Sequence, residues 1–363
     1  CENCTSDVCF QTGRIVIRCL GLGNFNNGDT DMCSAHHSSS AGKALPPPNP
    51  YELAKAWEKG SLRCPKCRKS SSLETFKCLQ LNDCPHCSTP FFMPQRIRDY
   101  FLYEPAGGGG MGSVYKAVSV KYPDRVLAVK VLARKERMNP PNIHAILNEA
   151  LVSYAFKDSQ FVAACLDSGF ADDEYFTVMD FIDGERLDKR IERLGMMPET
   201  EVIPMAMHLL AAEQHIFRRG YLFRDMKPEN VIINSCGYAV LLDFGLCIPL
   251  DAARNPTDEF ISGSPYYMPP ERLLGHPEDA YSDIYSLGMV MYHALTGHTL
   301  YDATELESLA KKHVAKMKVS NLARMTNMST GMAELVDRMI QQSPEERPQT
   351  FQEVLDALKA IAG

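Results

Sequence analysis

The sequence has no long apolar run and no excess of positive charge. No segment approaches the roughly 20 consecutive apolar residues that a membrane-spanning helix needs, and no signal-peptide pattern opens the chain. The formal net charge of −7 argues against a general nucleic-acid-binding protein. No internal repeat is evident. These absences favour a globular protein whose function must be read from local motifs.

The length and composition suit a chain of several domains. The 363 residues are enough for about two to three domains, and an apolar content of 45% can build a sizeable core. The first residue is cysteine rather than methionine, and the sequence leaves open whether the chain is a fragment. The cysteines and histidines of residues 1–50 could form a metal site, but their spacing matches no known template: Cys1, Cys4, Cys9, Cys19, Cys33, His36 and His37.

The most informative segment is Tyr-Leu-Phe-Arg-Asp-Met-Lys-Pro-Glu-Asn at 221–230, followed by Asp-Phe-Gly at 243–245. Asp225 can accept the proton of an attacking hydroxyl, and Lys227 can neutralise charge on a transferred phosphate. Asn230 and Asp243 supply the hard oxygen ligands that Mg²⁺ prefers. The spacing therefore indicates phosphoryl transfer from a metal-bound nucleotide.

A glycine-rich stretch upstream fits the nucleotide end of this reaction. It satisfies G-x-G-x-x-G-x-V, and glycine lets a backbone approach phosphate oxygens closely; the matching residues are Gly107, Gly109, Gly112 and Val114. Such a run alone is weak, because a flexible loop would look similar. An apolar run ends at Lys130, and segment 142–156 is expected to be a helix whose single acid is Glu149. A strand lysine held by a helical glutamate is how a kinase grips the α- and β-phosphates.

From about residue 96 to about residue 361 the chain resembles a eukaryotic-like (Hanks-type) serine/threonine protein kinase. Its glycine-rich motif is similar to that of bacterial members of the family. Further matching motifs are Gly-Ser-Pro-Tyr-Tyr-Met-Pro-Pro-Glu at 263–271, Ser-Asp-Ile-Tyr-Ser-Leu-Gly at 282–288 and Glu-Glu-Arg-Pro at 345–348. The resemblance implies an α+β fold with two lobes, a β-rich N-lobe and a helical C-lobe. It also implies an ATP- and Mg²⁺-dependent cytoplasmic enzyme that phosphorylates serine and threonine in protein substrates, including itself.

Two positions depart from the sequence motifs of the family. Phe223 stands where the family usually has a histidine that packs beneath Asp-Phe-Gly, so an aromatic replacement should preserve the stack. Pro269 replaces an alanine and removes no catalytic group. Because the catalytic set is complete, the sequence favours an enzyme over the alternative of a pseudokinase-like scaffold.

The resemblance also implies roles around the nucleotide. Met179 would guard the inner pocket, and the backbone from Asp180 to Ile182 would bond the adenine. The side chains above and below the ring would be those of Val114, Ala128 and Ile232.

Further implied roles concern the activation segment. The Ser264 hydroxyl would bond to the Asp225–Lys227 pair, and Arg347 would pair with Glu271. Arg224 would receive a phosphate that orders the segment. The candidate acceptors are Thr257 and Ser262, although Asp258 and Glu259 could supply the charge instead.

A second signal lies before the kinase-like region. Two C-x-x-C knuckles, separated by the sixteen residues 68–83, fit a four-thiolate structural zinc site made by Cys64, Cys67, Cys84 and Cys87. The spacing resembles a zinc ribbon, with short strands expected over 73–79. Cys78 is expected to be a small apolar strand residue, and His86 is an alternative ligand. Disulfides are the rival interpretation, which the reducing setting of a kinase disfavours.

The expected organisation is a cysteine-containing segment with a Pro-rich linker over 1–50, a zinc ribbon over 51–92 and a protein kinase domain over 97–362. A third functional alternative makes the ribbon the main unit, as a module that binds protein or nucleic acid. A protein partner is favoured there, because the ribbon shows no pattern of aromatic and basic residues.

Overall fold

The computed structural model describes residues 8–11, 14–17, 46–109, 112–256, 263–301, 311–315 and 328–363. The described residues of 46–154 and 164–182 form one compact unit, here called the N-terminal unit. Those of 155–163 and 183–363 belong to a second, the C-terminal unit. A hairpin pairs β1 (Val8–Gln11) with β2 (Arg14–Ile17). It includes Cys9, whereas the other candidate metal ligands of residues 1–50 lie outside the described residues.

The N-terminal unit begins with helix α1 (Pro50–Glu58) and two short hairpins. Asn49 caps α1 by accepting backbone N–H groups of the first turn, and Pro50 takes the first helical position, where its missing N–H is no loss. The hairpins pair β3 (Ser61–Arg63) with β4 (Ser70–Ser72) and β5 (Leu81–Asp83) with β6 (Pro90–Phe92).

Segment 73–79 does not form the strands expected from the sequence. Leu73–Thr75 is a short 3₁₀ helix (η2), and Cys78 lies in an exposed turn. The Ser72 hydroxyl accepts a hydrogen bond from the Glu74 N–H at 3.4 Å, and such a local bond competes with strand pairing. Both predictions for this segment are therefore wrong, and the ribbon's strands flank it instead.

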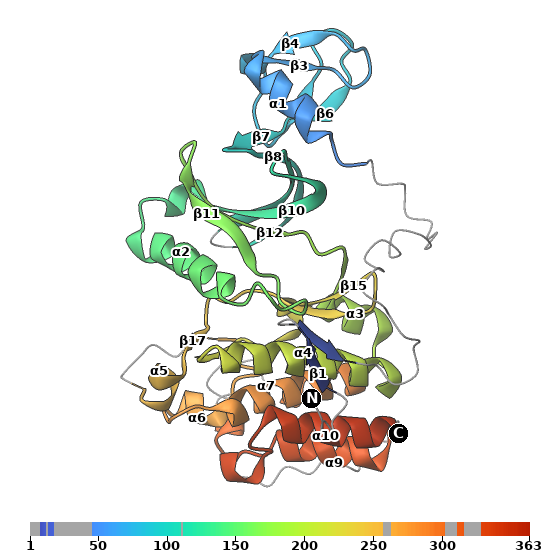
Figure 1. The fold of residues 1–363 in the computed structure, drawn as a ribbon, viewed down its shortest axis with the longest axis vertical. Helices are drawn as coiled ribbons and strands as arrows, with labels where there is room; N and C mark the ends of the chain where they lie inside the picture. The colour runs from blue at the N-terminus through green and yellow to red at the C-terminus, as the bar shows by residue number, and fades with distance from the viewer. Residues whose placement is uncertain are drawn as a thin grey trace. The chain divides into compact units, whose positions relative to one another are not determined.

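A six-stranded antiparallel sheet forms most of the N-terminal unit, in the order β11-β12-β10-β9-β8-β7 (Figure 1). Helix α2 (Pro140–Tyr154) packs against β11 and β12. It begins before the expected residue 142, because proline is tolerated in the first helical turn. The strands are β7 (Gln95–Ile97), β8 (Tyr100–Gly109), β9 (Gly112–Ser119), β10 (Tyr122–Leu132), β11 (Cys165–Ala171) and β12 (Glu174–Asp180).

Helix α1 and this sheet share a small apolar core. Leu53 of α1 is buried with Phe101 of β8 and Val118 of β9. Trp57, the single tryptophan of the chain, meets the Phe101 ring edge to face with centroids 5.3 Å apart. The ribbon region is thus joined to the sheet by side-chain packing as well as by the chain.

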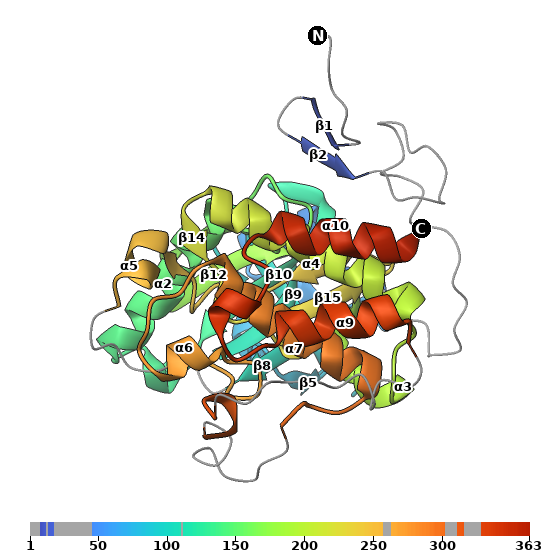
Figure 2. The ribbon, with the colours of Figure 1, turned by 90° about the horizontal axis from the view of Figure 1, so that it is seen from below.

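The described part of the C-terminal unit is mainly helical (Figure 2). Helix α4 packs against α7 and α10, and α9 packs against both of these. The helices are α3 (Leu187–Leu194), α4 (Glu199–Arg218), α5 (Leu250–Arg254), α6 (Pro270–Leu273), α7 (Ala280–Thr296), α9 (Thr330–Met339) and α10 (Phe351–Ala362). The short strands are β13 (Gly184–Arg186), β14 (Tyr221–Leu222), β15 (Val231–Asn234), β16 (Ala239–Leu241) and β17 (Ile248–Pro249).

Helix α7 is the buried centre of this unit. Asp279 and Ser282 form a capping box at its start, and Gly297 ends it with a left-handed φ of 76°. A Cβ at Gly297 would lie 2.0 Å from the carbonyl oxygen of Gly195, so only glycine fits there. The β-rich and helical units expected for the α+β kinase fold are both present. No described helix combines the length and apolarity needed to cross a membrane.

Helix α4 buries a carboxyl group, Glu213, whose two oxygens have no hydrogen-bond partner among the described residues. Burial raises the pKa of Glu213 well above its usual value, and the charge of Asp283 adds to the shift. The folded state therefore binds a proton that the unfolded chain releases above the ordinary pKa of glutamate. This contribution to stability is complete at acid pH and is lost as pH rises toward the folded-state pKa.

We therefore expect Glu213→Gln to raise the melting temperature by a few degrees at pH 8 and by less at pH 5. The amide has the same shape but never ionises. Thermal unfolding of both proteins across this pH range is the measurement, with the exposed Glu192→Gln as control. If the difference in melting temperature between the two proteins is the same at every pH, Glu213 does not titrate on unfolding.

Candidate functional site

The loop after β14 holds Asp225 in a fixed orientation. Its Oδ2 atom accepts hydrogen bonds from Lys227 Nζ and from Asn230 Nδ2, both at 2.7 Å. Asn230 Nδ2 also donates to the Asp225 carbonyl oxygen at 3.0 Å, and the Asp225 side chain is 6% exposed. Because both side-chain donors bind Oδ2, Oδ1 is the oxygen of Asp225 that can accept a proton.

A buried acid on α7 anchors this loop from behind. The Asp283 carboxylate accepts the backbone N–H groups of Phe223 and Arg224, each at 2.9 Å. Burial raises the pKa of Asp283 to about 6, while Arg272 and the two amide donors act in the opposite direction. Arg224 has a φ of 70°, a strained value for a residue with a side chain, and the two bonds hold it there. The sequence analysis did not identify this role of Asp283. The feature that could have indicated it is an acidic residue in the first turn of a helix expected to be buried.

Strand pairing brings the two candidate magnesium ligands to neighbouring strand ends. Val231 of β15 pairs with Leu241 of β16, and the Leu242 N–H donates to the Asn230 carbonyl at 2.8 Å. Asp243 is exposed, with a φ of 59°. Asn230 directs its Nδ2 at Asp225, so its amide oxygen is the atom left for a cation. One amide oxygen and one exposed carboxylate fit the donor preference of Mg²⁺.

Phe223 packs as the sequence analysis expected of an aromatic at this position. Its ring lies edge to face with the ring of Phe244 in the Asp-Phe-Gly motif, with centroids 5.6 Å apart. The Phe156 ring also contacts the Phe244 ring, with centroids 5.6 Å apart. The three rings form a buried stack that fixes the residue after Asp243.

In the N-terminal unit, Lys130 of β10 and Glu149 of α2 form an ion pair of 2.7 Å between Nζ and Oε2. Their side chains are 22% and 13% exposed, so the pair is largely shielded from water. Lys130 lies directly opposite Val114 in the β9–β10 register. The lysine expected to hold phosphates is therefore positioned by both a strand partner and a helix.

The glycine-rich stretch forms the β8–β9 hairpin, in which Gly107 pairs with Val114 and Gly109 with Gly112. A Cβ at Gly112 would lie 2.3 Å from the carbonyl oxygen of Val131 on β10. This glycine is thus required by the close approach of two strands, in addition to any role with phosphate.

The remaining expected nucleotide residues lie on the sheet or follow it. Ala128 pairs with Met179 between β10 and β12, and β12 ends at Asp180. Asp180 is bound by Arg125 at 3.2 Å, and Ile182 follows two residues later. Ile232 is on β15 of the C-terminal unit.

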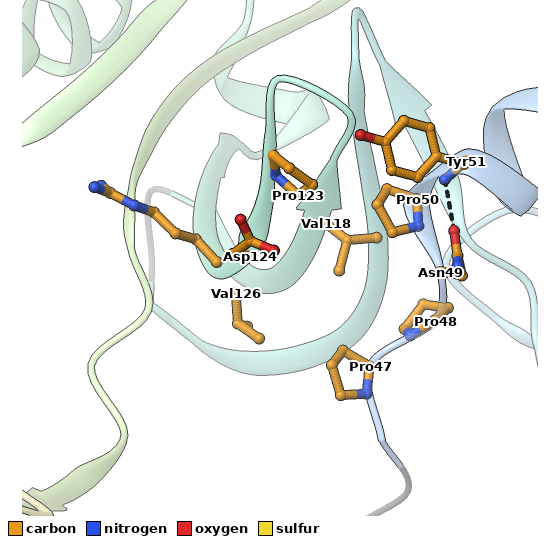
Figure 3. A pocket seen from close by; sticks show the side chains of 10 residues that line it. Pro47, Pro48, Asn49, Pro50, Tyr51, Val118, Pro123, Asp124 and Val126 are labelled. Atoms are coloured by element: carbon orange, nitrogen blue, oxygen red, sulfur yellow. Dashed lines mark hydrogen bonds between the residues drawn. The ribbon is translucent and has the colours of Figure 1, made fainter. Parts of the chain in front are cut away.

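A pocket of about 460 Å³ lies elsewhere on the N-terminal unit, between the Pro-rich linker and the β9–β10 hairpin (Figure 3). None of the expected nucleotide residues lines it, so we do not assign ATP to it. Its lining is Pro47, Pro48, Asn49, Pro50, Tyr51, Val118, Pro123, Asp124, Arg125 and Val126.

The four knuckle cysteines converge on one point in the ribbon. Their sulfur atoms all lie within 4.8 Å of one another, and Cys64–Cys87 and Cys67–Cys84 are each 3.7 Å apart. A tetrahedral site with Zn–S bonds of about 2.3 Å has sulfurs about 3.8 Å apart, whereas a disulfide needs about 2 Å. The geometry is compatible with one metal ion and rejects disulfides among these four residues.

The two knuckles repeat the same backbone pattern. Cys64 N–H donates to Lys69 O and Cys84 N–H to Thr89 O, at 2.9 and 3.0 Å. A hydrogen bond with the Thr89 hydroxyl lowers the pKa of Cys87 to about 6, whereas, against a backbone hydrogen bond from Lys69, desolvation and the neighbouring cysteines raise the pKa of Cys67 to about 11. The convergence of the four sulfurs, and not these opposite shifts, indicates the metal site. The alternative ligand His86 is not part of the cluster, since its Nε2 atom contacts the Ser70 carbonyl at 3.4 Å.

The activation-segment expectations have mixed outcomes. Arg347 pairs with Glu271 at 2.8 and 3.0 Å in a fully buried contact, as the motifs implied. Within the described structure, the Ser264 hydroxyl forms no hydrogen bond to Asp225 or Lys227, so that implied bond is absent. Arg224 pairs with Glu278, a residue the sequence analysis did not single out. Thr257, Asp258, Glu259 and Ser262 lie outside the described residues.

Comparisons with known proteins identify the family of this chain. A profile of the protein kinase domain matches residues 100–358. A probable serine/threonine-protein kinase of Clostridium perfringens is 28% identical over 262 residues, which cover 72% of this chain and 38% of that protein. The serine/threonine-protein kinase pkn2 of Myxococcus xanthus is 31% identical over 267 residues, covering 71% and 32%. The serine/threonine-protein kinase PrkC of Bacillus subtilis is 30% identical over 215 residues, which cover 59% of this chain and 33% of that protein. The chain thus spans well under half the length of these relatives.

Proposed function

The chain belongs to the protein kinase domain family, and from this premise we propose that it is a serine/threonine protein kinase. It transfers the γ-phosphate of ATP to hydroxyl groups of protein substrates and of itself. The observation that carries the proposal is the carboxylate of Asp225, held by Lys227 and Asn230 with one oxygen left to accept a proton. A scaffold without activity would not need this arrangement.

The mechanism assigns each group a step. Asp225 accepts the proton of the substrate hydroxyl. At the same time the hydroxyl oxygen forms a bond to the γ-phosphorus, and the bond between the γ-phosphorus and the oxygen of the β-phosphate breaks. Lys227 stabilises negative charge on the transferred group, and Lys130, oriented by Glu149, binds the α- and β-phosphates. Asn230 and Asp243 would hold Mg²⁺, which neutralises phosphate charge when bound.

The adenine site follows from the same assignment. The glycine-rich residues Gly107, Gly109 and Gly112 would cover the phosphates. Met179 would border the inner pocket, with adenine bonded by the backbone from Asp180 to Ile182. Apolar contact with the ring would come from Val114, Ala128 and Ile232.

We further propose that the four-thiolate cluster binds structural zinc. Four cysteine ligands leave no open position for catalysis, so the ion would stabilise the ribbon only. The proposed boundaries are 1–50 for the cysteine-containing segment and linker, 51–92 for the ribbon and 97–362 for the kinase domain. A protein partner of the ribbon stays a prediction, because its exposed large apolar side chains, those of Tyr51 and Leu81, are of a kind common on surfaces.

We expect Lys130→Met to raise the KM for ATP and to lower kcat by about 10²-fold, since it removes a cation that contacts phosphate in both the ground and transition states. Phosphate transfer from labelled ATP to a general protein substrate measures both constants. Hydrolysis of the product should yield phosphoserine and phosphothreonine. Lys135→Met changes an exposed lysine on the same unit and serves as control. Unchanged constants for Lys130→Met would remove this lysine from the site.

A further inference from the structure

The guanidinium of Arg224 is already paired with a carboxylate inside the protein. Its Nη2 atom lies 2.9 Å from Glu278 Oε1, and the two side chains are 17% and 5% exposed. A pair so shielded from solvent interacts more strongly than a surface ion pair and is little screened by salt. Arg224 immediately precedes Asp225, so its position affects the catalytic carboxylate.

The Glu278 carboxylate binds two arginines, one through each of its oxygens. Its second oxygen, Oε2, accepts hydrogen bonds from Arg272 Nε at 2.8 Å and from Arg272 Nη2 at 2.6 Å. Arg272 in turn donates through Nη1 to the carbonyl oxygen of Arg224. One carboxylate thus connects the side chain of Arg224 to a residue that also holds its backbone.

The charges of this cluster balance. Arg224 and Arg272 carry two positive charges, and Glu278 and Asp283 carry two negative charges when ionised. Asp283 accepts the backbone N–H groups of Phe223 and Arg224. The loop is therefore held through its amides, its carbonyl and a side chain without any added anion.

The segment that supplies Glu278 is itself fixed. The Glu278 N–H donates to the Ala253 carbonyl of α5 at 2.9 Å, and the neighbouring Asp279 accepts from Arg254 at 2.7 Å. Asp279 also begins the buried helix α7. The backbone that carries the Glu278 carboxylate is therefore held in place. A group that positions another side chain must itself be fixed in this way.

We propose that Glu278 is a positioning residue that takes the place of an activation-segment phosphate: it holds Arg224, and through it Asp225, in the catalytic arrangement. This rests on the kinase activity proposed above. The enzyme is then active without phosphate on Thr257 or Ser262, and the acids at 258 and 259 are not needed as substitutes.

The test compares kcat for a protein substrate among five proteins. These are the wild type before and after phosphatase treatment, Thr257→Ala with Ser262→Ala, Glu278→Gln, Glu278→Asp and the exposed control Glu192→Gln. We expect phosphatase treatment and the double alanine variant to leave kcat within about twofold. Glu278→Gln should lower kcat by about 10²-fold with the KM for ATP little changed, because it displaces a catalytic group without touching the nucleotide. Glu278→Asp, which keeps the charge, should recover part of the loss.

Two results would overturn the inference: a large fall in kcat on dephosphorylation or in the double alanine variant, or full activity of Glu278→Gln. If Glu278→Gln fails to fold, the dephosphorylated and double alanine proteins still test the inference, since a large fall in their kcat would show that phosphate, and not Glu278, positions Arg224. Absence of phosphate transfer by every protein, the wild type included, would instead reject the proposed kinase function.

Discussion

The Asp225→Asn variant is expected to lose about 10²–10⁴-fold in kcat, the usual contribution of a general base, while its fold and its affinity for ATP are retained. The two donors that bind Oδ2, Lys227 Nζ and Asn230 Nδ2, will select the amide oxygen of the new asparagine. Its NH₂ group must then take the position of Oδ1. A donor replaces the acceptor that the substrate hydroxyl requires, although the shape of the side chain is preserved.

Initial rates of phosphate transfer measure this loss, and calorimetric titration with ATP analogues measures binding. Asp251→Asn, which changes an exposed acid on α5, is the matched control and should have the wild-type rate. Near-normal turnover by Asp225→Asn would mean that another group accepts the proton. A variant that loses nucleotide binding equally would indicate damage to the loop and not removal of a base.

The catalytic constellation was predictable where its members are close in sequence or carry a distinctive chemistry. Asp225, Lys227 and Asn230 lie within six positions, and one loop followed by a short helix brings them into contact. The Lys130–Glu149 pair was predictable for another reason, because segment 142–156 offers a single acid to the lysine. The knuckle cysteines belong to the same class, since each C-x-x-C pair fixes its own geometry.

The partners of the catalytic loop were not predictable, because tertiary packing selects them. Asp283 is about sixty residues from the amides that it binds, and Glu278 is about fifty from Arg224. Many acids in the C-terminal unit could have filled either role, and only tertiary packing around the start of α7 decides. Local hydrogen bonding explains the error over 73–79, where a serine cap produced a 3₁₀ turn in a segment with strand-like composition.

Replacing Cys64 and Cys67 together by serine is expected to abolish binding of about one zinc ion per chain and to unfold the ribbon locally. Structural zinc contributes about 10–16 kcal/mol in small zinc domains. The ribbon's strands are three residues long and form two separate hairpins. The thiolate contacts Cys64–Cys87 and Cys67–Cys84 connect one hairpin to the other, so little remains to hold the two together without metal.

The loss should end at helix α1, and Trp57 reports where it ends. The ring of Trp57 packs on Phe101 of the kinase sheet and not on a knuckle, so its fluorescence should stay that of the wild type in the double variant. Cys78→Ser, which changes an exposed cysteine outside the cluster, should keep its zinc. Full zinc content in the double variant would disprove the site. Zinc loss with a red-shifted Trp57 emission would show that α1 leaves the sheet with the ribbon, and that the metal also stabilises the strand carrying the glycine-rich stretch.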